Sequence, residues 1–330
     1  MADFARWIER EWQTDGVVSR LLAPLAWLYG GAVTLNRHLY RAGWRRSIAF
    51  PVPVVVVGNV TVGGTGKTPL VLWVVRYLRE RGWRPGIVTR GYGGDARAWP
   101  QHVRADSDPS LVGDEPVLLA RRSSAPVIAD PDRPRAVREL LKHGCNVVVS
   151  DDGLQHYRLR RDVEIAVIDA SRGLGNGRCL PAGPLREPAV RLRQVDARVR
   201  QGGGNGDAWP MRLVPLEFRQ VQPPHRAAPL AAFRGRTVHA AAGIGHPPRF
   251  FGTLRGLGVG VIEHAFPDHY RFQRADLPFA DGRDVIMTEK DAVKCERFAA
   301  DHWWYLAVEA DLDPAFGDWL LARLGKPADG

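Results

Sequence analysis

Apolar residues in this chain gather into short runs that alternate with longer stretches of mixed apolar and polar residues. Val54–Val57 is an uninterrupted β-branched run, which is typical of a strand buried on both faces. The mixed stretch Leu70–Arg81 indicates a helix, and Gly82 suits the position just after its end. Repetition of this pattern predicts an α/β fold with a mostly parallel sheet flanked by helices.

Further strands and helices are predicted in the same rhythm, namely strand 86–89, helix 116–122, helix 133–143, strand 147–149, strand 165–168, strand 238–242, helix 250–257, strand 285–288, strand 305–308 and helix 316–324. Gln201–Asp207 is glycine-rich and predicts a turn, with antiparallel flanking strands as one arrangement. Val221–Pro229 is proline-rich and resembles a linker. We therefore expect a helical segment, a core domain and a smaller α/β C-terminal domain, at residues 1–48, 49–228 and 229–330.

The N-terminal segment has a different pattern. Residues 1–13 indicate a charged amphipathic helix, and Leu21–Leu35 has no charged side chain. The second stretch is shorter than the roughly 20 residues that span a bilayer, and Pro24 interrupts it. Arginines and aromatic residues follow it, which is typical of an interfacial membrane segment. The alternative is a pair of helices packed on the domain core.

Composition adds limited information. The formal net charge is +10, and only five of the 46 basic residues are lysines. Such an excess favours anionic partners, although an arginine-rich balance also follows from genome composition. The basic residues are dispersed, with no helix-turn-helix, RRM or zinc pattern, so we expect no nucleic-acid partner. The three cysteines lie far apart, which fits a reducing cytosol better than a disulfide framework.

The strongest chemical signal is a glycine loop between the first strand and its helix. Glycines let backbone N–H groups approach phosphates, and the helix N-terminus favours the negative charge. Lys67 is placed to reach the β- and γ-phosphates of ATP, and the Thr68 hydroxyl to ligate Mg²⁺. The leading glycine of the usual P-loop pattern is Thr61 here. The predicted nucleotide-binding residues are Thr61, Val62, Gly63, Gly64, Thr65, Gly66, Lys67 and Thr68.

A P-loop needs a metal-binding carboxylate at the end of a neighbouring strand. Asp151 and Asp152 follow the apolar run 147–149 after Ser150. Ligands of open α/β sheets bind at the carboxyl ends of the strands, so at least one of the two should face Mg²⁺. The structural alternative is that both carboxylates cap a helix. The sequence leaves open which of them contacts the metal.

An ordered set of motifs carries a family resemblance. The chain contains VGNVTVGGTGKTP, TRGYGG (89–94), VGDEP (112–116), SDDGLQH (150–156), PAGPLREP (181–188), FPDHY (266–270) and TEKDAVK (288–294). In this order they resemble the tetraacyldisaccharide 4'-kinase family, which phosphorylates a lipid A precursor. The resemblance implies a P-loop kinase that uses ATP to phosphorylate the 4'-hydroxyl of a tetraacylated glucosamine disaccharide 1-phosphate, forming lipid IVA. It also implies peripheral association with the cytoplasmic face of the inner membrane.

The resemblance also implies catalytic roles. Asp114 matches the proposed base of the family. Lys67 of the phosphate loop is a further catalytic candidate. His269 matches the partner of that base, with His264 as an alternative. On sequence alone, Asp114 also suits a helix cap, and His269 beside Asp268 an ordinary surface pair.

Five further residues are candidates for contact with the substrate. His156 ends the DDGxQH motif, and Arg186 and Glu187 lie in the LREP segment. Arg90 either neutralises phosphate charge or only follows the end of a strand. Tyr92 stacks either on a ligand or on the core.

Some features leave their function open. Lys290 and Asp291 are adjacent, unlike the spaced pair of the GTPase base-reading motif, so we expect a loop that faces the nucleotide, or local ion pairing. Gly243–Gly245 is a candidate phosphate-facing turn, although one GxG is weak evidence. The competing function is a membrane-associated P-loop switch or assembly ATPase, which needs no sugar acceptor. We expect a monomer whose partners are the lipid substrate and a membrane surface.

Overall fold

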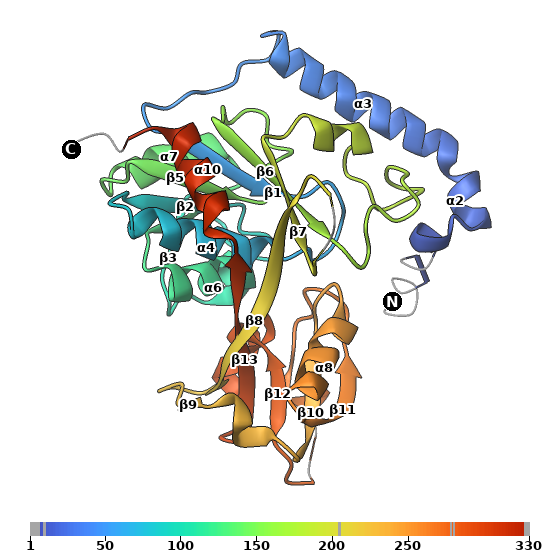
Figure 1. Ribbon diagram of the computed structural model, residues 1–330, viewed down its shortest axis with the longest axis vertical. Coiled ribbons are helices and arrows are strands. Elements are labelled where there is room, and N and C mark those ends of the chain that lie inside the picture. The colour runs from blue at the N-terminus through green and yellow to red at the C-terminus, as the bar shows by residue number, and fades with distance from the viewer. Residues whose placement is uncertain (1–6, 9–10, 204–205, 278, 280, 327–330) are drawn as a thin grey trace.

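The protein has a larger and a smaller lobe, which two long strands join (Figure 1). The computed structural model describes residues 7–8, 11–203, 206–277, 279 and 281–326. The joining strands are β8 (Trp209–Gln220) and β13 (Trp303–Leu312). They belong to one sheet that runs through both lobes, so the predicted α/β architecture is confirmed.

The larger lobe contains the first part of this sheet. Its strands are β1 (Val54–Gly58), β2 (Pro85–Thr89), β3 (Gln101–Val103), β4 (Val127–Ala129), β5 (Val147–Asp151), β6 (Val163–Asp169) and β7 (Ala197–Gln201). They lie in the order β7, β6, β1, β5, β2, β4, β3, parallel except for β3. All residues of β1 are buried, as its β-branched run predicts.

Helices cover both faces of the first-lobe sheet. α4 (Lys67–Arg79) and α6 (Asp114–Ser123) pack their apolar residues on one face, and α7 (Arg133–Leu141) packs on the other. The lobe also contains two shorter helices, α5 (Pro109–Val112) and the 3₁₀ turn η1 (Ala189–Arg193). The carboxyl ends of β1, β5 and β6 therefore share one edge of the sheet.

The smaller lobe repeats this architecture. Its elements are β9 (Ala227–Ala228), η2 (Leu230–Phe233), β10 (Thr237–Ala242), α8 (Pro247–Gly256), β11 (Gly260–Ala265), η3 (Arg274–Asp276), β12 (Val285–Thr288), α9 (Glu289–Cys295) and η4 (Glu296–Phe298). β11, β10, β12 and β13 are parallel neighbours. α8 contributes to the core on one face of them, and α9 to the core on the other.

The two joining strands are paired along most of their length. β8 and β13 run antiparallel from Gln220 beside Trp304 to Met211 beside Leu312, with a bulge between Ala307 and Val308. The chain then returns to the larger lobe as α10 (Pro314–Leu324). This helix shares the core of α4, although the predicted division groups it with residues 229–330.

The N-terminal helices lie along the larger lobe (Figure 1). α2 (Val17–Leu21) leads into α3 (Ala23–Arg41), which buries Ala26 and Gly30 and exposes most of Leu28. One face of α3 is thus packed on the lobe, and another exposes apolar side chains. Much of the amphipathic helix expected at residues 1–13 lies outside the described residues. Along the described chain, no helix combines the length and apolar character needed to cross a bilayer.

Three local predictions need correction. β7 and β8 on either side of Gln201–Asp207 are parallel neighbours, so the antiparallel arrangement is wrong. The expected linker Val221–Pro229 contains β9, which pairs with β8. The expected loop at Lys290–Asp291 is the first turn of α9, because the Thr288 hydroxyl accepts a hydrogen bond from the Asp291 N–H and caps the helix.

Candidate active site

The glycine loop connects β1 to α4 and has the geometry of a phosphate loop. Gly63 and Gly66 adopt positive φ angles of 90° and 89°, which L side chains rarely adopt. Thr61 is absent from the described residues with positive φ, so its position does not require glycine. The loop is further held by the Val62 N–H, which donates to the Pro184 carbonyl at 2.9 Å.

Asn59 organises this loop from beneath, a role that the sequence analysis missed. Its side chain is fully buried, and its amide donates to the Thr65 hydroxyl at 3.2 Å and to the Gly63 carbonyl at 3.4 Å. A buried amide with such partners fixes the loop before any ligand arrives. The available signal was a polar residue directly after a buried apolar strand.

Lys67 and Asp152 meet at the carboxyl edge of the sheet. The Lys67 Nζ lies 3.6 Å from the Asp152 Oδ1, and the Arg186 Nη1 donates to both carboxylate oxygens at 2.9 and 3.1 Å. Burial alone would raise the pKa of Asp152, but the charges of Lys67 and Arg186 hold that pKa well below its usual range. Three predicted site residues are therefore in direct contact.

Asp151 has a different environment from its neighbour. It is buried, and its Oδ1 has no hydrogen-bond partner among the described residues. Burial, together with the charges of Glu115 and Asp152, raises the pKa of Asp151 to about 7. Its backbone carbonyl accepts a hydrogen bond from the Arg133 Nη2 at 2.8 Å. A buried carboxylate oxygen without a partner is a position suited to a cation.

Asp114 and His269 come together from different lobes. Asp114 begins α6 and is buried, and its Oδ1 lies 3.5 Å from the His269 Nδ1. The Lys294 Nζ lies 3.7 Å from the other carboxylate oxygen. Tyr92 lies edge-on to the His269 ring, with 4.9 Å between the centroids. The first-lobe carboxylate is thus surrounded by second-lobe donors.

This pairing shifts both pKa values. Burial would raise the pKa of Asp114, but His269 and the charges of Lys290 and Lys294 hold it well below its ordinary range. Burial would lower the pKa of His269, but contact with Asp114 leaves that pKa above its ordinary value. Asp114 is therefore ionised at neutral pH.

His264 has other partners. Its Nε2 lies 3.0 Å from the Nδ1 of His239, and its ring packs on Phe279. Of the two candidate histidines, only His269 lies beside Asp114 in the described structure.

Lys290 links the same group of side chains through ion pairs, although its partners Glu115 and Asp268 are not local in sequence as the ion-pairing alternative supposed. Its Nζ donates to the Glu115 Oε1 at 3.0 Å and lies 3.2 Å from the His269 Nε2. Burial would lower the pKa of Lys290, but Glu115, Asp114 and Asp268 raise it above its usual value. It therefore adds a permanent positive charge at the junction of the lobes.

The remaining substrate candidates divide into accessible and inaccessible residues. Arg90 and Tyr92 are exposed. His156 is half-buried with an unpaired Nε2, and burial together with the charge of Arg133 lowers its pKa to about 4. These positions are compatible with ligand contact.

Glu187 is not accessible for contact with the substrate, contrary to the prediction. Its side chain is fully buried, accepts hydrogen bonds from Gln155 at 2.9 Å and from the Tyr157 hydroxyl, and lies 3.8 Å from Arg37 of α3. This network ties the N-terminal helix to the lobe and leaves no free carboxylate for a sugar.

Comparison with known proteins supports the assignment that this geometry suggests. The family model described as tetraacyldisaccharide-1-P 4'-kinase matches residues 18–325. The chain belongs to the tetraacyldisaccharide 4'-kinase family. It is 55% identical over 326 residues to the tetraacyldisaccharide 4'-kinase of Alkalilimnicola ehrlichii, covering 98% of this chain and 96% of the relative.

Other relatives agree with this membership. The tetraacyldisaccharide 4'-kinase of Halorhodospira halophila is 56% identical over 307 residues, covering 91% of each chain. The crystal structure of LpxK from Aquifex aeolicus in complex with ATP superposes with a TM-score of 0.77 at 27% identity. It covers 94% of this chain and 100% of that one. The kinase described here therefore shares its fold with a solved member of the family.

Proposed function

We propose that this kinase transfers the γ-phosphoryl group of ATP to the 4'-hydroxyl of a tetraacylated glucosamine disaccharide 1-phosphate. The observation that carries the proposal is the meeting of Asp114 and His269 from opposite lobes. Glu115, next to Asp114, lies close enough to Asp151 to raise its pKa, so the two carboxylate groups belong to one site. A base and a phosphate loop at one lobe junction suit a kinase with a bound acceptor.

ATP is expected in the loop 59–66, with Lys67 directed at its terminal phosphates. The relative from Aquifex aeolicus was solved with ATP, and the glycine turns here offer backbone N–H groups at the start of α4. Arg186 pairs with Asp152, and it shares that carboxylate with Lys67. We propose that both cations also face the position where phosphate charge would lie.

Mg²⁺ fits the residues at the same edge. The unpaired buried oxygen of Asp151 is suited to it, and we propose that Asp151, Asp152 and the Thr68 hydroxyl hold the ion. When bound, Mg²⁺ would neutralise part of the phosphate charge. Within the described residues, no group of three or more His, Cys, Asp or Glu side chains forms a metal site, so we expect phosphate oxygens to complete the coordination.

Asp114 is the proposed acceptor for the proton of the attacking hydroxyl. It is ionised, and His269 orients it from the second lobe. A carboxylate with a depressed pKa is a weak base. In a loose phosphoryl-transfer transition state the hydroxyl loses its proton late, so correct position matters more than basicity.

A membrane surface is the proposed location of the acceptor. α3 exposes large apolar side chains, with Trp27, Leu28 and Leu35 at 74%, 71% and 60% exposure. Burying such residues in an interface is favourable, while the acyl chains stay in the bilayer and the sugar enters the cleft. We place the protein at the cytoplasmic face of the inner membrane, where ATP is available.

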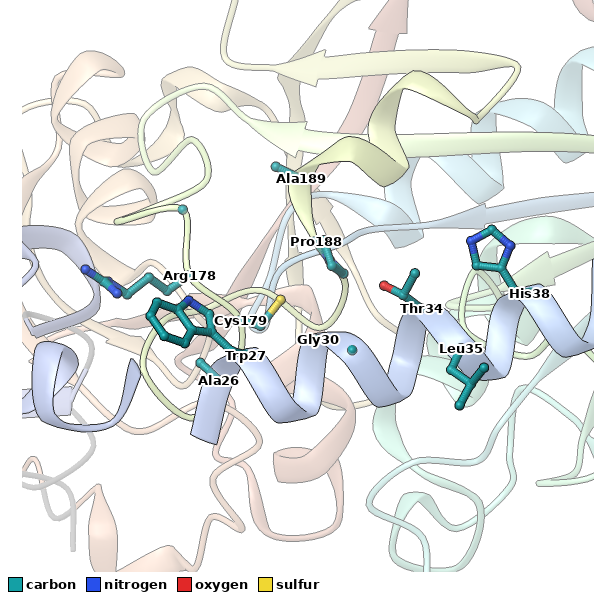
Figure 2. Close-up of a pocket in the computed structure, with 12 residues that line it drawn as sticks. Ala26, Trp27, Gly30, Thr34, Leu35, His38, Arg178, Cys179, Pro188 and Ala189 are labelled. Atoms are coloured by element: carbon teal, nitrogen blue, oxygen red, sulfur yellow. The ribbon is translucent and has the colours of Figure 1, made fainter. Parts of the chain in front are cut away.

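An apolar groove beside α3 supports this arrangement. It has a volume of about 620 Å³ and lies between the helix and the segment that contains Cys179 and Pro188. Figure 2 shows Thr34 and His38 directed toward that segment, while Leu35 points away from it. Trp27 and Leu35, which we expect at the membrane, also line this groove, so we expect it to open to the same apolar phase that holds the acyl chains.

The test uses γ-labelled ATP with a tetraacyl disaccharide 1-phosphate in mixed micelles. A kinase moves the label into an extractable lipid in proportion to the ADP that forms. A switch or assembly ATPase would release the label as free phosphate whether or not the lipid is present. Release without lipid labelling, at saturating acceptor, would remove the proposed function.

A further inference from the structure

Arg172 lies at the phosphate loop although a different strand carries it there. It follows β6, which pairs with β1 in parallel, so both strands end at the same edge of the sheet. A Cβ atom on Gly63 would lie only 2.7 Å from the Arg172 Nη1. The guanidinium is therefore directly beside the central glycine of the loop.

The second lobe approaches the same point. The Arg172 Nη1 donates to the Gly245 carbonyl at 3.3 Å. A Cβ atom on Gly245 would lie 2.6 Å from the backbone nitrogen of Gly64. The Gly243–Gly245 turn thus contacts the phosphate loop, and Arg172 lies at the contact.

The segment that carries Arg172 is fixed by buried polar contacts. Asp169 is 1% exposed and accepts hydrogen bonds from the Ser171 hydroxyl at 2.7 Å and from the Arg249 Nη2 at 2.5 Å. Because Arg249 belongs to α8, the second lobe holds the segment in place. The position of Arg172 consequently depends on how the lobes are arranged.

We propose that Arg172 contacts the γ-phosphoryl group during transfer and is a further catalytic residue of this kinase. In that step the acceptor oxygen forms a bond to the γ-phosphorus as the bond to the β–γ bridging oxygen breaks. The electron pair leaves with ADP, and the hydroxyl proton goes to Asp114. Negative charge then lies on the equatorial oxygens of the moving group, and an arginine supplied by the same chain can stabilise it.

Two other cations lie at the same edge of the sheet. Lys67 lies 3.6 Å from Asp152, and Arg186 binds the same carboxylate, so both cations are partly neutralised. Because Gly63 has no side chain, the Arg172 guanidinium can lie directly against the loop. The inference rests on the proposed placement of ATP in this loop.

The first test replaces Arg172 by alanine and by lysine, with the exposed Arg138 of α7 replaced by alanine as the control. We expect Arg172→Ala to lose roughly 10³-fold in kcat, as removal of an arginine finger does, and to bind ATP with nearly unchanged affinity. Arg172→Lys should recover little, because an ammonium lacks the planar donor geometry. Arg138→Ala should keep the wild-type kcat. A kcat within about threefold of wild type in Arg172→Ala would overturn the proposal.

The second test separates catalysis from a purely structural contact with Gly245. ADP with aluminium fluoride mimics the moving phosphoryl group, and the wild-type kinase should bind it more tightly than ADP alone. Arg172→Ala should lose this gain at an unchanged melting temperature. Retention of the gain, or full rescue of kcat by lysine, would assign Arg172 a structural role only. If the wild-type protein labels no lipid, the proposed function fails instead, and the comparison with ADP still reports on Arg172.

Discussion

Asp114 owes its ionised state to side chains from the other lobe. His269, Lys290 and Lys294 all follow Asp114 by more than a hundred residues, and together they outweigh the effect of its burial. The proposed base is therefore complete only when the two lobes meet. Two predictions follow at the scale of single residues.

Asp114→Asn should remove the proton acceptor and keep the shape of the side chain. We expect kcat to fall by roughly 10²- to 10⁴-fold, the usual contribution of a general base. The affinity for ATP should stay close to wild type, because the phosphate loop is untouched. Steady-state kinetics and nucleotide titration measure the two quantities, with the exposed Asp106→Asn as the control. An unchanged kcat would exclude Asp114 as the base.

His269→Ala should change the pH dependence of turnover. Contact with His269 is one cause of the low pKa of Asp114, so its removal raises that pKa. Since the base must be ionised, activity should then be lost at a higher pH as the solution is acidified. The acid limb of kcat/KM measures this, and His264→Ala should leave the limb in place. A limb that is the same in His269→Ala and wild type would contradict the pairing.

Residues in recognisable motifs could be placed from the sequence, but their burial could not. The order of Lys67, Asp151 and Asp152 after strands predicted a common edge, and Lys67 and Asp152 are in contact there. Glu187 shares a motif with Arg186, yet it faces inward to Arg37. Neighbours in a motif point in different directions, and only the packing around them decides which one is accessible.

At the scale of elements, α3 combines a packed face and an exposed apolar face. Gly30 allows close packing, since a Cβ atom there would lie 3.3 Å from the Cys179 sulfur. The exposed face should bind membranes without supporting the fold. Point substitutions on this face therefore test membrane contact better than deletion of residues 1–35, which would remove the packed face as well.

Replacing both Trp27 and Leu28 by serine should weaken binding to anionic vesicles. Each large apolar side chain contributes about 1.5–3 kcal/mol on full burial, so we expect at least a tenfold loss of vesicle affinity. ATP affinity and the melting temperature should not change. Vesicle flotation measures the effect, with the exposed Val214→Ser of β8 as the control. Equal flotation of the variant and wild type would exclude this face as the membrane contact.

Elements with clear periodicity could be predicted, whereas short and mixed elements could not. β1, β12 and α10 follow from their apolar patterns within a few residues. β8 contains Pro210 and Pro215, and only Met211 and Phe218 in it are buried, so its sequence did not indicate a long strand. Pairing with β13 supplies the order that its local sequence lacks.

At the scale of the whole molecule, α10 follows the smaller lobe in the chain but packs on the larger one. Phe316 of α10 is fully buried, 5.6 Å from Trp73 of α4 between ring centroids, and the Tyr77 hydroxyl donates to Asp318 at 2.6 Å. The sequence predicted this helix but not its location. Its packing partner lies more than 200 residues away, and no local pattern encodes such a contact.

Phe316→Ala should therefore destabilise the larger lobe. Loss of a buried aromatic ring costs about 3–5 kcal/mol in the free energy of unfolding. We expect the larger lobe, which contains the P-loop, to unfold at a lower urea concentration. Loss of nucleotide binding as urea is added measures this midpoint. The exposed Ala322→Ser of the same helix is the control. If only the smaller lobe lost stability, the helix would belong to that lobe.

The bulge in the β8–β13 ribbon has a consequence for how the enzyme moves. Backbone hydrogen bonds hold the ribbon on both sides of Ala307 and Val308, so the lobes have little freedom to swivel about a loose tether. Because a bulge bends and twists its strand, we expect the lobes to open and close by bending and twisting at this irregular step. Entry of the lipid and enclosure of the nucleotide then share one degree of freedom, so occupancy of one substrate site should change the rate at which the other fills.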